Sequence, residues 1–327
     1  MEINYRYIAY LLSMTCFCFF VYNWYMKIHY INYYPIHSSR ISKNPAIVTK
    51  VHAKTENQRH GCGVILFAHI HKCAGGTVRA WFKKHAPLLD MMTNSKEEMK
   101  EIKEAKKIKG IMQYDPKWEK AIPQVDSFLA DVPDKTGWKV LHLHSLFPGL
   151  YLSREYIEKW KKSVEAKGCI FYKTTVLRDP LARFVSHVNF RNIPSTMVDT
   201  FMEGSKNWLI RFLLFGICGN KGEDLTCRFQ VSGNVTSSPN LNERLTAEMK
   251  MILNDFDLIG FSDNLEDYFE TIRNITGWKD GPNQDKRIHK SQDTFKITRN
   301  MLEKFVKLNQ KDYMFYNKMK NNITEYF

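Results

Sequence analysis

The chain has 327 residues, which is room for one sizeable domain and about 60 further residues. Hydrophobic residues make up 44% of it and charged residues 25%, as in globular proteins rather than disordered ones. The formal net charge of +14 favours anionic partners such as nucleic acid, anionic lipid, a nucleotide or an acidic glycan, without choosing among them.

The N-terminal region contains a stretch suited to crossing a membrane. Residues 7–26 carry no formal charge over about twenty positions, the length that a spanning helix needs, and Tyr and Trp lie near the ends. No small-residue cleavage site follows, as a cleavable signal peptide would require. We therefore expect a single N-terminal transmembrane helix, a signal anchor, after a cytosolic tail of residues 1–6. Residues 27–61 show no sustained period and are expected to form a stem.

A strand, a glycine turn and a helix are expected from residue 64 onwards. Residues 64–70 form an apolar run typical of a buried strand, and residues 71–77 form a tight turn that contains Gly75 and Gly76. The first N–H groups of the following helix lack internal partners, so the arrangement suits an anion. Lys72 adds a full positive charge beside them. The alternative is an ordinary strand-to-helix connection.

The stretch before the next strand is less informative. Residues 96–109 carry Glu and Lys three or four apart, which indicates an exposed helix. A nucleic-acid surface is less favoured, because no aromatic residues are interleaved for base stacking. Residues 110–137 contain several prolines and are expected to be irregular.

Two histidines distinguish the next expected strand, residues 139–145. His142 and His144 are two positions apart and therefore share one face, where a buried parallel strand normally carries apolar residues. A neutral imidazole can take a proton near neutral pH. Two hydrogen-bonded structural histidines are the alternative, and a zinc site is less favoured because no third and fourth ligand accompanies the pair.

A second candidate anion site lies in residues 174–190. Asp179 suits the N-cap of a helix and Pro180 its first position. Arg178 ends the preceding strand and Ser186 lies two turns into the helix, so both are expected to reach one anion above the sheet edge. The alternative is that Arg178 pairs with a carboxylate and Ser186 is a surface hydroxyl.

Strands and helices alternate along the rest of the chain, which predicts an α/β fold with a central parallel sheet flanked by helices. Ligands of such sheets bind at the carboxyl ends of the strands. The other expected strands are residues 169–177 and 256–260, and the other expected helices are residues 153–167 (capped by Ser153), 206–215, 241–253, 264–275 and 296–320.

The cysteines outside the membrane segment are odd in number. Cys218 and Cys227 bracket a short polar loop and are the favoured disulfide. Cys62 and Cys169 each precede a strand, and they can pair if those strands are neighbours. Cys73 would then be left as a free thiol in the glycine turn.

Three Asn-x-Thr sequons agree with a lumenal location for the domain, although each is a short pattern that also arises by chance. Their asparagines are Asn234, Asn274 and Asn322.

Several segments resemble PAPS-dependent sulfotransferases. The turn resembles the loop of that family that binds the 5′-phosphosulfate, with His71 where proline is usual. Residues 177–186 resemble the family's 3′-phosphate site nearly residue for residue, and residues 286–291 resemble a loop that folds over the donor nucleotide. The donor-binding residues implied by this resemblance are Lys72, Cys73, Ala74, Gly75, Gly76, Thr77, Arg178, Ser186, Lys290 and Ser291.

The resemblance covers about residues 62–320 and is that of Golgi carbohydrate sulfotransferases of the heparan and chondroitin type. It implies a P-loop-like sheet, with His144 as general base, His142 in a supporting role and Lys72 as the group that stabilises the leaving phosphate. The expected protein is a single-pass type II Golgi membrane enzyme with a lumenal domain of residues 62–327.

This enzyme would move a sulfuryl group from PAPS to a hydroxyl of a glycan or glycosaminoglycan-like acceptor, without a metal and without a nucleic-acid partner. A P-loop kinase or nucleotidase that requires Mg²⁺ is one alternative. A catalytically silent lumenal glycan-binding protein is the other. The sequence indicates neither the acceptor sugar nor the oligomeric state.

Overall fold

The computed structural model describes residues 61–91, 117–130, 137–144, 149–219, 228–231, 234–237, 255–279 and 295–321. All of them fall within one compact unit, Ala46–Phe327. The segments predicted to be a cytosolic tail and a transmembrane helix, and nearly all of the predicted stem, lie outside these ranges. Within them, no helix has the length and hydropathy that crossing a membrane requires.

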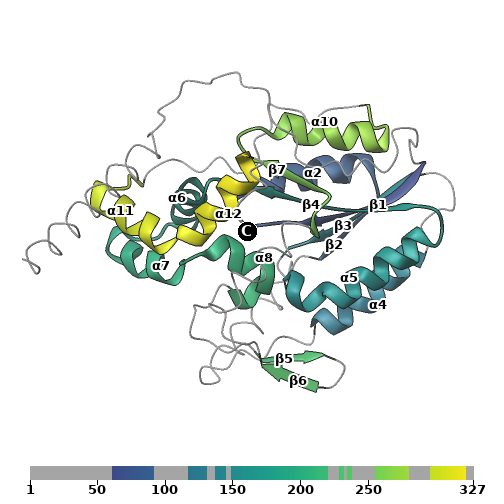
Figure 1. Ribbon diagram of the computed structural model, residues 1–327, viewed down its shortest axis with the longest axis horizontal. Helices are drawn as coiled ribbons and strands as arrows, with labels where there is room; N and C mark the ends of the chain where they lie inside the picture. The colour runs from purple at the N-terminus through teal and green to yellow at the C-terminus, as the bar shows by residue number, and fades with distance from the viewer. Residues whose placement is uncertain are drawn as a thin grey trace, which may run out of the picture. The chain divides into compact units, whose positions relative to one another are not determined.

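A parallel sheet of five strands forms the centre of this unit (Figure 1). Every neighbouring pair in the sheet is parallel, so all five carboxyl ends meet at one edge. The α/β prediction is therefore confirmed. In spatial order the strands are β2 (Leu88–Met91), β3 (Gly137–Leu143), β1 (Cys62–Ala68), β4 (Ile170–Leu177) and β7 (Leu258–Phe261).

Helices cover both faces of the sheet, because its central strands are apolar on both sides. On β1, Ile65 and Phe67 pack with α2 (Gly75–His85) and α10 (Leu265–Thr276). Val64 and Leu66 alternate with them and pack toward α4 (Lys117–Ala130), α5 (Leu150–Glu165) and α8 (Trp208–Gly219). All four β1 side chains are fully buried, which explains why this strand has no polar face.

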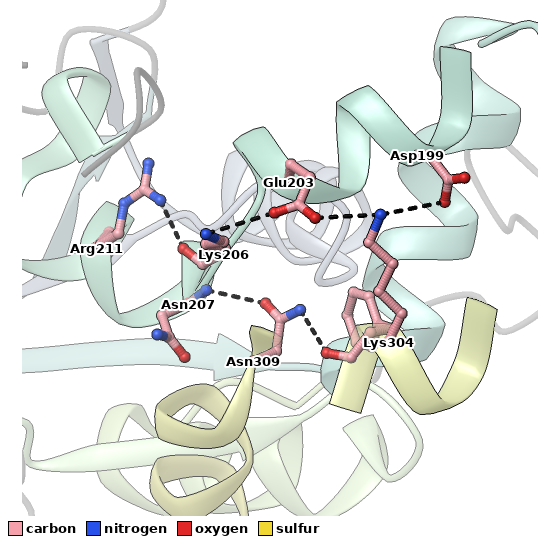
Figure 2. A network of polar contacts seen from close by, with 8 residues as sticks. Asp199, Glu203, Lys206, Asn207, Arg211, Lys304 and Asn309 are labelled. Atoms are coloured by element: carbon pink, nitrogen blue, oxygen red, sulfur yellow. Dashed lines mark hydrogen bonds and ion pairs between the residues drawn. The ribbon is translucent and has the colours of Figure 1, made fainter. Parts of the chain in front are cut away.

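The helices that follow β4 pack with the C-terminal helices. Those that follow β4 include α6 (Pro180–Arg191), the short 3₁₀ helix η1 (Ser195–Met197) and α7 (Val198–Gly204). The C-terminal helices are α11 (Arg299–Leu308) and α12 (Gln310–Asn321). Figure 2 shows the contacts: Lys304 of α11 lies 3.1 Å from Glu203 and 3.7 Å from Asp199, both of α7. The Asn309 side chain accepts a hydrogen bond from the Asn207 N–H at 3.0 Å. The C-terminal helices are therefore joined to the segment that begins at the carboxyl end of β4.

The prediction that residues 110–137 are irregular is partly wrong, because α4 spans Lys117–Ala130. Ala121, Val125 and Leu129 recur every four residues and are buried, so one stripe of the helix packs into the core. Pro123 lies inside the helix and removes one N–H donor. The packing of the buried stripe outweighs the loss of that hydrogen bond.

The predicted start of the next helix is also wrong. Helix α5 begins at Leu150, after Gly149, and Ser153 lies inside it. The Ser153 hydroxyl donates a hydrogen bond to the Gly149 carbonyl at 2.7 Å, the backbone contact that serine makes within helices.

The remaining expected elements agree with the structure to within a few residues where they are described. Residues 206–215 fall in α8, 256–260 in β7, 264–275 in α10, and 296–320 in α11 and α12. Strand β2 and the antiparallel hairpin of β5 (Arg228–Val231) and β6 (Asn234–Ser237) were not expected. The helices predicted at residues 96–109 and 241–253 lie outside the described residues.

A disulfide joins Cys62 at the start of β1 to Cys169, the residue before β4. The two strands are neighbours in the sheet, which is the condition under which this pair was expected. Cys73 is a free, buried thiol, as the same expectation required. The predicted Cys218–Cys227 pair lies outside the described residues, because Cys227 and the Cys218 side chain are not described.

Candidate functional site

The predicted site residues converge at the carboxyl edge of three adjacent strands. Strand β1 lies between β3 and β4. It leads into the turn that contains Lys72, whereas β3 leads to His144 and β4 to Arg178. The His69 N–H donates to the Leu143 carbonyl at 2.8 Å, which continues the β1–β3 pairing beyond the assigned strands. Sheet topology thus brings together residues more than 100 positions apart in the sequence.

The turn after β1 has an unusual backbone. Four described residues other than glycine have a positive φ, and two of these are asparagines, which tolerate that region. The other two are Lys72, with φ of 66°, and Ala74, with φ of 60°. Such conformations cost roughly 1–3 kcal/mol each and cluster at functional sites. Among the described loops, the strained backbone of this turn therefore indicates a functional site here rather than elsewhere.

The N-terminus of α2 is open to an anion. Ala74 occupies the N-cap position but provides no side-chain hydrogen bond, and the first turn holds no acidic residue. The helix dipole and the free N–H groups of such a turn attract negative charge. Helix α6 differs, because the Asp179 side chain caps it by accepting from the Ala182 N–H at 2.8 Å.

Gly75 is required by the close approach of its neighbour His69. A Cβ at this position would lie 1.9 Å from Cδ2 and 2.0 Å from Nε2 of His69, which no side chain can do. Position 76 has no neighbour within 4 Å of a Cβ, so Gly76 is free of this constraint.

Cations gather around Lys72. Arg178 Nη1 donates a hydrogen bond to the Lys72 carbonyl oxygen at 3.2 Å, which ties the end of β4 to the turn after β1. Burial, followed by the positive charges of Arg178 and Arg191, lowers the pKa of Lys72. The Lys72 ammonium lies 3.9 Å from the centroid of the Phe190 ring, a cation–π contact. Lys72 and Arg178 follow the ends of two strands, and with Arg191 at the end of α6 they form a site suited to an anionic ligand.

Three other predicted donor-binding residues, Ser186, Cys73 and Thr77, can be located. Ser186 is buried in α6, so the surface-hydroxyl alternative is wrong for it. Cys73 is also buried, and burial raises the pKa of its thiol to about 12, so it stays protonated and unreactive. Thr77 lies half-buried in the first turn of α2. Lys290 and Ser291 lie outside the described residues.

His142 is fully buried, and both of its ring nitrogens have partners. Nδ1 lies 2.7 Å from Asp90 Oδ1, and Nε2 lies 2.9 Å from His69 Nδ1. A histidine held in this way cannot reach a substrate hydroxyl. Its geometry is that of a residue that positions its neighbours, whereas the expected supporting role, orientation of the acceptor, stays a prediction.

His144 is half-buried and lies among other histidine rings. Its ring centroid lies 4.0 Å from that of His69 and 4.3 Å from that of His71. Burial, and then the neighbouring His142, lowers the pKa of His144 to about 3. The imidazole is therefore neutral at neutral pH and has a lone pair with which to accept a proton.

Four residues around His142 and His144 were not predicted from the sequence: His69, His71, Asp90, and Arg79, whose side chain donates to Asp90. A signal for the first two was present, since His69-Ile70-His71 repeats the His-x-His spacing of His142-Leu143-His144 at the end of the adjacent strand. No sequence pattern indicated Asp90 or its partner Arg79 as site residues, because β2 was not expected and its pairing with β3 depends on strand order.

The described part of the chain holds no group of three or more His, Cys, Asp or Glu side chains placed to bind a metal ion. Of the three predicted glycosylation sites, Asn274 is exposed on α10 and Asn234 begins β6, whereas Asn322 lies outside the described residues.

No protein-family model matches the chain, and no curated protein matches it significantly. The residues at this edge of the sheet are therefore the indication of function.

Proposed function

We propose that this protein is a carbohydrate O-sulfotransferase that uses PAPS as donor. The observation that carries the proposal is the Arg178–Lys72 contact, which joins two segments that separately resemble the two phosphate sites of that family. PAPS has phosphate groups at its 5′ and 3′ positions and needs two such sites in one protein. The fold proposed is accordingly a P-loop-like sheet, which the strained turn between β1 and the open N-terminus of α2 supports.

In the proposed reaction, a glycan hydroxyl oxygen attacks the sulfur of the sulfuryl group. The new O–S bond forms as the bond between sulfur and the bridging phosphate oxygen breaks, and that oxygen keeps the electron pair. His144 takes the hydroxyl proton, for which its neutral state is suited. Lys72 stabilises the charge that develops on the leaving phosphate.

Arg178 and Ser186 would hold the 3′-phosphate, and the α2 N-terminus with Thr77 the 5′-phosphate. The remaining donor contacts, Lys290 and Ser291, are proposed on the sequence resemblance alone. The surplus of positive charge suits an acidic, glycosaminoglycan-like acceptor as well as the donor. A lumenal Golgi location behind a signal anchor belongs to the same proposal.

Ligand-dependent melting of the purified full-length chain tests the donor. A ligand that binds only the native state raises the melting temperature. We expect adenosine 3′,5′-bisphosphate to raise it without a metal, and ATP with Mg²⁺ to leave it unchanged. A shift with ATP and Mg²⁺ alone would overturn the proposal in favour of a kinase or nucleotidase.

Substitutions then separate binding from turnover. Arg178→Ala should abolish most of the shift caused by the bisphosphate, whereas His144→Ala should keep the shift and lose transfer of radioactive sulfate from PAPS to a glycosaminoglycan mixture. Glu303→Gln, which removes an exposed charge on α11 far along the chain from the site, is the matched control and should change neither.

A further inference from the structure

A chain of polar contacts connects the edge strand β2 to the Lys72 turn. Arg79 of α2 donates from Nε to Asp90 Oδ2 at 2.5 Å, and its Nη2 pairs with the same oxygen. The second carboxylate oxygen, Oδ1, lies 2.7 Å from His142 Nδ1. His142 Nε2 in turn lies 2.9 Å from His69 Nδ1. The sequence of contacts is therefore Arg79, Asp90, His142 and His69.

These contacts permit only one direction of donation. Burial lowers the pKa of both His142 and His69, so both rings are neutral and each carries one N–H. The ionised carboxylate of Asp90 only accepts, so the His142 proton lies on Nδ1. Nε2 of His142 then has a lone pair and accepts from Nδ1–H of His69. The remaining nitrogen of His69, Nε2, carries a lone pair.

His69, the last residue in this series of polar contacts, lies beside the proposed catalytic groups. The Cδ2–Nε2 edge of His69 occupies the space that a Cβ of residue 75 would fill, at the first position of α2. The same ring lies 4.0 Å, centroid to centroid, from His144. The tautomer of His69 therefore determines whether a lone pair or an N–H faces the turn.

We propose that Asp90 is a positioning residue that, through His142, fixes the tautomer of His69 beside the Lys72 turn and the His144 ring. The role in turnover rests on the sulfotransferase function proposed above, whereas the tautomers do not depend on it.

Asp90 also favours proton uptake by the base. Its negative charge raises the pKa of His144 against the larger, opposite effect of burial. The N–H bonds of His142 and His69 both point toward the Asp90 carboxylate. When His144 accepts a proton, this carboxylate and these aligned N–H dipoles stabilise the new positive charge. Loss of the carboxylate charge or reversal of the dipoles would raise the barrier to proton transfer.

Asp90→Asn tests the assignment because Arg79 can only donate. The amide oxygen must face Arg79, so the amide NH₂ faces His142 Nδ1 and that nitrogen has to accept. The His142 proton then moves to Nε2, which donates to His69 Nδ1, and the His69 proton moves to its own Nε2. One substitution is thus expected to invert the tautomers of two histidines.

Nitrogen NMR of the full-length chain labelled with ¹⁵N-histidine distinguishes protonated from bare ring nitrogens. We expect two rings to change from Nδ1–H to Nε2–H in Asp90→Asn, and none to change in Arg79→Met or in the surface control Glu303→Gln. In the double variant Arg79→Met/Asp90→Asn the amide can turn its oxygen toward His142, so the original tautomers should return. Unchanged tautomers in a folded Asp90→Asn protein would overturn the assignment.

Turnover provides the second measurement. Asp90→Asn should lower kcat by about 100-fold, a size typical of impaired acid–base catalysis, and leave KM for PAPS and the bisphosphate melting shift unchanged. The double variant should recover part of kcat, since it restores the tautomers but not the charge. Inverted tautomers with an unchanged kcat would overturn the role in turnover. Failure of the unsubstituted protein to transfer sulfate would refute the proposed function instead, and leave the tautomer result standing.

Discussion

At the level of single residues, the histidines show where local pattern is sufficient and where it is not. That His142 and His144 share a face follows from the two-residue period of a strand, and their rings do stack, with centroids 5.9 Å apart. Their partners come from other strands. His69 directly follows β1 and Asp90 lies on β2, and the order β2-β3-β1 that brings them to His142 cannot be read from spacing within one strand.

Gly75 gives the first prediction. In Gly75→Ala the new methyl group would overlap the His69 ring, so the ring must leave His142 or the turn must shift. Overpacking of this kind costs roughly 1–3 kcal/mol. We expect a lower free energy of unfolding by chemical denaturation and a weaker melting shift with adenosine 3′,5′-bisphosphate.

Gly76→Ala is the matched control, because a Cβ there meets nothing within 4 Å. It should be close to wild type in stability. If the two alanine variants behave alike, close packing of His69 is not the reason for glycine at position 75.

At the level of secondary-structure elements, a clear local pattern of residues decided what could be predicted. The long strands β1 and β4 and the helix α6 with its Asp179 cap were all expected. Strand β2 has only four residues and shows no alternating burial, so its pattern is too short to be recognised. Helix α4 was missed because Pro123 resembles a break, whereas its buried stripe becomes evident only once the sheet is present to bury it.

The N-termini of α8 and α12 cap one another. Asp312 of α12 accepts hydrogen bonds from the N–H groups of Leu209 and Ile210, at 2.9 and 3.0 Å. The Asn207 side chain, just before α8, accepts in return from the Lys311 N–H at 3.0 Å. Each helix thus satisfies free N–H groups of the other, which stabilises them as a pair.

The second prediction concerns this pair. Asp312→Ala removes both acceptors and should lower the free energy of unfolding by about 2 kcal/mol, at the upper end for a helix cap because the site is buried. Asp312→Asn keeps one acceptor oxygen and should lose about half as much. Urea denaturation of the three proteins measures this. Equal losses for the two variants would contradict the capping role.

At the level of the whole molecule, the disulfide is the third prediction. Cys62 and Cys169 are 107 residues apart, so their bond restricts a long loop of the unfolded chain. In the chain-entropy account such a loop contributes about 4–5 kcal/mol. Cys62→Ser/Cys169→Ser should therefore melt at a markedly lower temperature. Cys73→Ser removes the free thiol and should have a smaller effect, which makes it the control; a loss equal to that of the double variant would contradict this ranking.

The last prediction is that the protein loses stability in mild acid. Burial is the main cause that lowers the pKa of five histidines in the folded protein, to about 3 for two of them, His144 and His187. The other three are His69, His71 and His142. In the unfolded chain each has a pKa of about 6.5.

The sign follows from proton binding. Above about pH 6.5 these histidines are neutral in both states and have no effect on stability. As the pH falls below that value the unfolded chain takes up protons that the folded protein excludes, so the free energy of unfolding declines. Each excluded proton contributes about 1.4 kcal/mol per pH unit, down to the folded pKa of its histidine. Three buried carboxyls act in the opposite direction, because burial raises the pKa of Asp179 and Asp257, and that of Asp312 to about 6, so their contribution favours the folded state as the pH falls.

Five histidines outweigh these three carboxyls, so urea denaturation should give a lower free energy of unfolding at pH 5 than at pH 7.5. His187→Phe isolates one contribution: the ring packs edge-on against Phe201, with centroids 5.2 Å apart, and phenylalanine keeps that apolar contact without titrating. The variant should lose less stability between the two pH values than the unsubstituted protein does. An equal or greater loss in the variant would show that His187 is not among the groups that make the fold sensitive to acid.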